Sequence, residues 1–121
     1  MGFFGVDLNN LPEIGPVPKG EYDLEITATK DHEKFLSICL DVCGEDSADD
    51  VWYKVWKINP DDPIKKQARN KQEIMKFLEA FNMSDFDDPD ELLHAHCTAQ
   101  LDTQPSYKNP SIMENYIVSF S

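Results

Sequence analysis

Apolar and polar side chains alternate strictly in two segments of the first half of the chain. Residues 20–28 place apolar side chains at every second position, namely Tyr22, Leu24, Ile26 and Ala28. Residues 35–42 repeat this period with Leu36, Ile38, Leu40 and Val42. Because successive side chains of a strand point to opposite faces, both segments predict half-buried strands. The short polar link between them, at residues 30–33, predicts an antiparallel hairpin.

The second half of the chain predicts one helix between strands. Residues 51–58 are typical of a third strand, residues 94–103 of a fourth with weaker alternation, and residues 113–120 of a last one. From residue 64 to residue 81 the apolar positions recur at helical spacing, which predicts an amphipathic helix of four to five turns.

Capping residues predict where the helices begin and end. Asp62 is suited to cap the main helix, with Pro63 as its first residue, so we expect a helix over about 63–81. Asn82 is a plausible stop. A capping pattern at residues 88–91 predicts a short second helical turn that ends at Leu93.

The predicted order of elements is strand, strand, strand, helix, strand, strand. This order favours an all-β dominated fold, a five-stranded antiparallel barrel of the OB-fold type with the main helix between strands three and four. The length of 121 residues predicts one domain. We assign residues 20–121 to it and residues 1–19, which are rich in turn formers, to an irregular N-terminal arm. In that arm, apolar residues at positions 3–8 are candidates to anchor it to the domain or to a neighbouring subunit.

The segment Val51-Trp-Tyr-Lys-Val-Trp-Lys-Ile58 carries the strongest functional signal, because it combines three aromatic rings with two lysines. Trp52, Lys54 and Trp56 share one face of this strand. If that face is exposed, the indoles can stack on nucleobases while the ammonium groups hold phosphates. The alternative is that the two indoles form the core face, in which case Tyr53 on the opposite face replaces them as the stacking ring. The pattern alone leaves both open.

Charge is distributed unevenly along the chain. The net charge of −12 opposes a nucleic-acid partner, yet seven of the eleven basic residues fall between positions 51 and 76. We therefore expect a basic strip on an acidic body, although a solvated helix surface explains such runs equally well. The candidate phosphate partners are Lys54, Lys57, Lys65, Lys66, Arg69 and Lys71.

Metal binding and catalysis are both disfavoured by the residue pattern. His94 and His96 would need Cys39 and Cys43 as further zinc ligands, but two strand residues four apart lie about 13 Å from each other. The acid pairs that precede prolines are explained by helix capping, and no phosphate-binding glycine loop or nucleophile signature is present. We expect no cofactor, no metal and no catalytic residue. The three cysteines, in a chain with no signal peptide, are expected to be reduced thiols in the cytoplasm where the protein is made.

The chain resembles a family of small phage-encoded single-stranded DNA-binding proteins with an OB-fold. The resemblance lies in Pro18-Lys-Gly-Glu-Tyr-Asp-Leu-Glu-Ile26, in Trp56-Lys-Ile58 before the proline-bounded helix, and in Tyr107 with Asn115-Tyr-Ile-Val118. It implies a replication or recombination accessory that coats single strands in the host cytoplasm. It also implies possible homo-oligomers and partners among replication or recombination proteins. Tyr107 and Lys108 join the candidate DNA-binding residues on this basis.

Two other function classes fit the composition. An acidic protein that mimics nucleic acid, or engages a basic partner, agrees directly with the charge of −12. A sugar-binding or structural virion module is the other, because tryptophan surfaces also stack on sugar rings. Binding to single strands that weakens with salt would distinguish a single-stranded DNA-binding protein from both of these classes.

Overall fold

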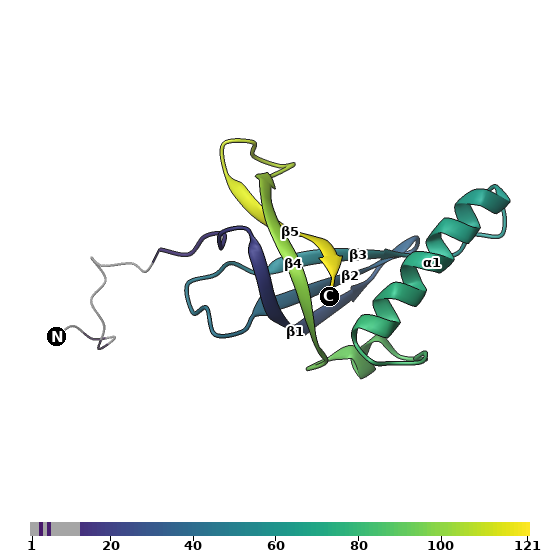
Figure 1. Ribbon diagram of the computed structural model, residues 1–121, viewed down its shortest axis with the longest axis horizontal. Helices are drawn as coiled ribbons and strands as arrows, with labels where there is room; N and C mark the ends of the chain where they lie inside the picture. Colours follow the sequence, from purple (N-terminus) through teal and green to yellow (C-terminus); the bar gives the residue numbers. More distant parts are fainter. Residues whose placement is uncertain (1–2, 4, 6–12) are drawn as a thin grey trace.

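A computed structural model of the chain, which describes residues 3, 5 and 13–121, contains one antiparallel sheet of five strands (Figure 1). The strands are β1 (Gly20–Asp31), β2 (Phe35–Val42), β3 (Val51–Trp56), β4 (His96–Pro105) and β5 (Met113–Phe120). They pair in the order β3-β2-β1-β4-β5. Helix α1 (Ile64–Ala80) and the 3-10 helix η1 (Pro89–Leu92) lie between β3 and β4. The predicted order of elements is confirmed.

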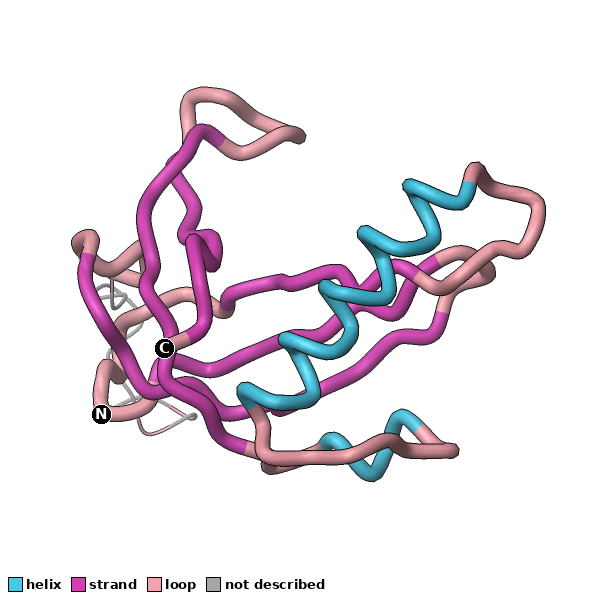
Figure 2. The backbone as a smooth tube through the Cα atoms, turned by 45° about the vertical axis from the view of Figure 1, so that its right-hand side comes forward, coloured by secondary structure: helices cyan, strands magenta, loops and turns pink. Residues whose placement is uncertain are grey.

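The sheet curls into a nearly closed, OB-fold-like barrel. β3 and β5 form its two edges, which approach each other without pairing, and α1 lies along this gap (Figure 2). Four aromatic rings fill the space between the helix and the two strands: Tyr53, Phe77, Phe81 and Phe120. Their edge-to-face and stacked contacts join the helix to both edges, so α1 takes the place of the missing strand pairing.

The predicted alternation of β2 matches the core. Leu36, Ile38, Leu40 and Val42 are all buried inside the barrel. In β1, Leu24 and Ile26 are fully buried, but the prediction that Ala28 continues their face is wrong, since Ala28 is exposed. The pairing with β2 shifts between Ile26 and Ala28, so two residues of β1 oppose one of β2. This β-bulge turns the rest of the strand by one position.

The helix boundaries differ from the predicted ones by one residue at each end. The N-cap is Pro63, and no side chain caps the helix, so the prediction of Asp62 as the cap is wrong. The Asp62 carboxylate instead lies 3.5 Å from the ammonium of Lys66. Asn82 adopts a left-handed backbone with φ 55° just after the helix, which confirms it as the stop. The capping box of Asp88 and Glu91 is also confirmed.

The described part of the N-terminal arm is attached to the barrel by a buried amide. Asn115 of β5 accepts a hydrogen bond from the Val17 backbone N–H at 2.8 Å and donates to the Val17 carbonyl at 2.9 Å. Gly15 forms an isolated bridge with Ala48. Phe3 is exposed, and the predicted anchoring by the other apolar residues up to position 8 lies outside the described residues. In the part of the chain that the structure describes, no helix is long and apolar enough to cross a membrane.

Candidate functional site

The two tryptophans of β3 stand on the outer face of the barrel. Trp52 is 59% exposed and Trp56 is 47% exposed, whereas Val51 is fully buried. Tyr53 and Val55 pack partly against the core. This orientation follows from the register with β2, because the β3 residues on the inner face pair with Leu36, Ile38 and Leu40. Of the two alternatives for this strand, the structure has the one with both indoles outside.

Trp56 belongs to a row of rings that extends across the first hairpin. It pairs directly with Phe35 of β2, and the ring centroids of the two are 5.0 Å apart. His32 in the β1–β2 turn also stacks on Phe35, with ring centroids 4.4 Å apart. The ammonium of Lys54 lies 4.8 Å from the Phe35 ring centroid, which is cation–π geometry. We call His32, Phe35, Trp56, Lys54 and Trp52 the aromatic platform.

Trp52 forms the other end of the aromatic platform. It is four residues from Trp56, so the two Cα atoms lie about 13 Å apart along the strand. Lys54 lies between them and pairs with Ser37, which in turn pairs with Lys30 of β1. The outer face of β3 therefore carries an indole ring, an ammonium group and a second indole ring, in that order along the strand. The two indoles are too far apart to stack on one base and would contact different parts of a ligand.

The sequence pattern did not identify His32 and Phe35 on this face, and it predicted that Lys30, which lies among acids in the first half of the chain, would contribute little. For Phe35 a signal was present, because the alternation that placed Leu36 inside also placed Phe35 outside, next to the end of the third strand. The position of Lys30 depends on the β-bulge of β1, which no local pattern predicts. His32 lies in a turn, where strand periodicity says nothing about side-chain direction.

The ammonium group of Lys57 bonds to other residues of the protein. Its ammonium lies 2.6 Å from a carboxylate oxygen of Asp31 and donates a hydrogen bond of 2.7 Å to the carbonyl oxygen of His32. The Lys57 backbone N–H also bonds to the carbonyl of Lys34 at 3.0 Å. These bonds fasten the β1–β2 turn to the end of β3. Lys57, a predicted phosphate partner, therefore supports the turn that carries His32.

The other predicted bases lie on two separate elements. Lys65, Lys66, Arg69 and Lys71 are exposed on α1, whose N-terminus lies at the same end of the molecule as the end of β3 (Figures 1 and 2). Tyr107, 98% exposed, and Lys108 lie in the β4–β5 loop. In both views this loop is remote from the N-terminus of α1. The structure thus brings together Trp52, Lys54 and Trp56 but not the whole predicted set.

Tyr53 contacts the helix instead of the outer face. Its ring lies 6.1 Å from that of Phe77 and 5.3 Å from that of Phe120, measured between centroids. Burial raises the pKa of the Tyr53 hydroxyl, and the negative charge of Glu73 adds to this effect. A hollow of about 680 Å³ between α1 and β5 begins beside this ring. The indoles are not on the core face, so Tyr53 does not replace them as the exposed stacking ring.

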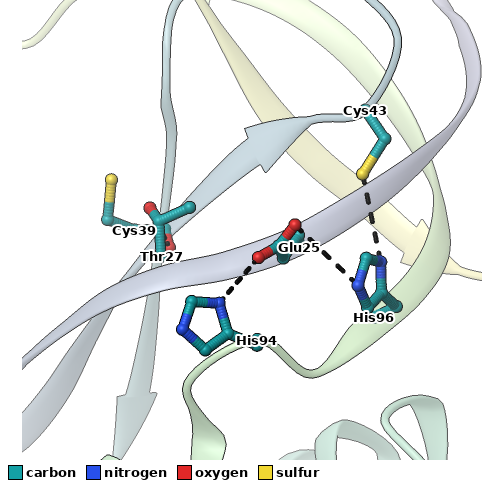
Figure 3. A network of polar contacts seen from close by, with 6 residues as sticks. All are labelled: Glu25, Thr27, Cys39, Cys43, His94 and His96. Carbon is teal, nitrogen blue, oxygen red and sulfur yellow. Dashed lines mark hydrogen bonds and ion pairs between the residues drawn. The ribbon is translucent and has the colours of Figure 1, made fainter.

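A second group of polar side chains surrounds Glu25 of β1 (Figure 3). A carboxylate oxygen of Glu25 lies 2.9 Å from Nδ1 of His94, and the other lies 3.8 Å from Nε2 of His96. The hydrogen bond with His94 lowers the pKa of Glu25, although burial opposes it. The thiol of Cys43 lies 4.0 Å from Nδ1 of His96. Cys39, which the sequence grouped with Cys43, points elsewhere beside Thr27.

The three cysteines are free thiols with different surroundings. Cys39 and Cys97 are buried, while Cys43 is partly exposed. Burial raises the pKa of Cys97 to about 12. Burial also raises the pKa of Cys43, and the carboxylates of Asp41, Glu25 and Asp23 act in the same direction. Negative charge is therefore concentrated around the Cys43 thiol.

Comparison of the chain with protein-family models and with curated proteins found no match to either.

Proposed function

We propose that the protein binds single-stranded DNA on the outer face of β2 and β3. The observation that carries this proposal is the aromatic platform, in which Trp52, Trp56 and the half-buried Phe35 are collected on one exposed sheet face. Large rings grouped on a surface favour a binding site, because leaving them in water gains nothing for folding. In OB-folds, the face of strands two and three is where oligonucleotides or oligosaccharides bind.

Stacking suits a ligand whose sequence is not read. Every base has a flat face, so rings take bases of any identity at about 1–3 kcal/mol each. Lys54 and Lys30 are placed between and beside the rings, where phosphates of a bound strand would pass. The proposed binding is therefore non-specific and combines stacking with contacts to the backbone.

The acidic body limits how this binding works. At a net charge of −12, the protein repels a polyanion at long range, so affinity has to come from local bases. Each lysine that contacts a phosphate of a single strand adds about 0.7 to the slope of log affinity against log salt. We expect replacement of Lys65 and Lys66 by glutamine to lower this slope if α1 extends the binding strip beyond the aromatic platform.

The biological role is proposed from the resemblance to phage-encoded single-stranded DNA-binding proteins. The OB-fold-like barrel agrees with the fold of that family. The resembling motifs lie at the first strand, at the end of the third and in the last strand, so they are distributed over the whole barrel. On this basis the protein is a replication or recombination accessory that coats single strands and performs no catalysis.

A titration of the protein's tryptophan fluorescence with oligonucleotides tests the proposal. Single-stranded oligonucleotides should quench the exposed indoles, duplex of the same sequence should bind more weakly, and a rise in salt should weaken both. Binding that is equal for duplex and single strand, or flat with salt, would contradict it.

The charge of −12 favours a second candidate, an acidic protein that engages a basic partner. That function predicts no affinity for oligonucleotides and capture of a basic protein. A sugar-binding function predicts quenching by oligosaccharides without any dependence on salt. The same titration, repeated with these two ligands, separates the three candidates.

A further inference from the structure

The barrel topology brings three potential metal ligands together on one outer surface. β1 is the central strand, and Glu25 pairs with Asp41 of β2 on one side and with His96 of β4 on the other. Cys43 directly follows β2, and its backbone N–H bonds to the carbonyl of Asp23 at 2.9 Å. Glu25, Cys43 and His96, which are far apart along the chain, thus meet near the middle of β1, where β2 ends and β4 begins (Figure 3).

The distances among these side chains are close to those of a metal site. One ligand atom from each of Glu25, Cys43 and His96 lies within 4.8 Å of the other two. Tetrahedral zinc with bonds of about 2.0–2.3 Å needs ligand atoms roughly 3.3–3.8 Å apart. His96 presents one ring nitrogen to Cys43 and the other to Glu25. A rotation of its exposed ring and a small approach of the thiol would therefore complete the geometry.

The donor types indicate which ion would bind. Thiolate, imidazole and carboxylate are the three side-chain donors that zinc uses in proteins. Calcium and magnesium prefer oxygen ligands alone, so a thiol and an imidazole argue against them. The nearby carboxylates of Asp41 and Asp23 add negative charge, which favours a cation at this position.

His94 lies directly beside this group and contacts Glu25. His94 has φ 69°, a left-handed conformation that is uncommon for residues other than glycine. Its backbone N–H bonds to the carbonyl of Ile26 at 2.8 Å, while its ring holds one oxygen of Glu25 at 2.9 Å. Carboxylates that ligate metals are usually held by a hydrogen bond from a neighbouring group, and His94 supplies such a bond to Glu25.

We propose that Glu25, Cys43 and His96 bind one zinc ion, with His94 as the positioning residue that orients Glu25. Cys39 and Cys43 lie too far apart along an extended segment to share a zinc ion, but Cys39 is not part of this set. The ion would join β1, the end of β2 and the start of β4. This site is independent of nucleic-acid binding, because none of its residues belongs to the aromatic platform.

Titration with zinc and cobalt tests the proposal. The full chain, freed of metal by a chelator, should bind one Zn²⁺ per chain in calorimetry. Co²⁺ should give the near-ultraviolet absorption of a thiolate-to-cobalt charge transfer. Cys43→Ser should abolish this absorption, whereas Cys39→Ala, which removes a thiol outside the site, should keep it. Absence of the band in the unchanged protein, or its survival in Cys43→Ser, would overturn the proposal.

Three further variants keep the test independent of folding. His96 is 62% exposed in its side chain, so His96→Gln should fold, as circular dichroism can verify, and should lose zinc binding. His94→Gly removes the positioning ring without backbone strain and should weaken zinc binding by about 10- to 100-fold, with the charge-transfer band retained. His94→Asn, which tolerates the same backbone and offers a donor to Glu25, should recover part of the affinity. Unchanged zinc affinity in folded His96→Gln would show that the cluster is not the site.

Discussion

Truncation of Trp56 separates a role in binding from a role in folding. Trp56 is 47% exposed, so roughly half of it is packed, and its ring contacts Phe35. A tryptophan buries about 150–250 Å² when it is fully covered. Half of that, about 100 Å² at about 25 cal/mol per Å², gives about 2.5 kcal/mol of stability lost in Trp56→Ala. A domain of this size has about 5–15 kcal/mol of stability, so the variant should stay folded.

The affinity for a single strand should fall measurably in a variant that stays folded. Loss of one stacked base costs about 1–3 kcal/mol, which is a factor of about 5 to 150 in the dissociation constant. Trp56→Phe keeps a flat ring and should retain most of the affinity. Trp56→Leu keeps an apolar side chain without a ring, and its affinity should resemble that of the alanine variant. The order Trp, Phe, then Leu with Ala is the signature of stacking.

The assay is a fluorescence titration with a single-stranded oligonucleotide. In the variants of Trp56 the signal comes from Trp52, the other tryptophan, which is exposed on the same face. Val118→Ala, a truncation of a 54% exposed residue on β5, is the matched control and should leave the affinity unchanged. Denaturant unfolding measures the stability of each variant. The stacking role of Trp56 is refuted if folded Trp56→Ala binds the oligonucleotide as tightly as the unchanged protein, or if Val118→Ala loses as much affinity.

Three further predictions follow from other contacts. Lys54→Gln should lower the slope of log affinity against log salt by about 0.7. Lys19→Gln removes a charge outside the aromatic platform and should not change this slope. Equal slopes in the two variants would contradict a phosphate contact by Lys54. Asn115→Leu should cost about 2–5 kcal/mol, because it leaves both backbone groups of Val17 without their bonds, and denaturant unfolding measures this loss. Iodoacetamide should modify Cys43 first in the metal-free folded protein, because the other two thiols are buried; mass spectrometry of proteolytic fragments would show a different first site if this is wrong.

The elements of this fold follow from local patterns. Alternation in residues 35–42, helical spacing from residue 64 and the capping box of Asp88 with Glu91 each correspond to an observed element. These patterns succeed because strand and helix periods are properties of the backbone, and burial on one side imposes them on the sequence. The acidic balance of the chain was likewise readable from its composition.

The position of the candidate site depended on tertiary contacts. Both faces of residues 51–58 carry large apolar side chains, so only pairing with β2, whose inner residues are already buried, decided that Trp52 and Trp56 face outward. The β-bulge after Ile26 moved Ala28 out of the core. The fold also decided whether a basic side chain already has an acidic partner, as the ion pair of Lys57 with Asp31 shows.

The group of Glu25, Cys43 and His96 shows most clearly that local patterns do not predict which distant residues meet in the fold. Its members come from three segments that no spacing rule connects. From the sequence, Cys43 and His96 were considered only together with Cys39 and His94, and Glu25 was not included. The three members meet because β1 pairs with β2 on one side and with β4 on the other, which aligns residues separated by up to 71 positions. Local periodicity determined the strands and the helix, while the register between strands determined which side chains share a surface, because register is set by contacts between distant segments.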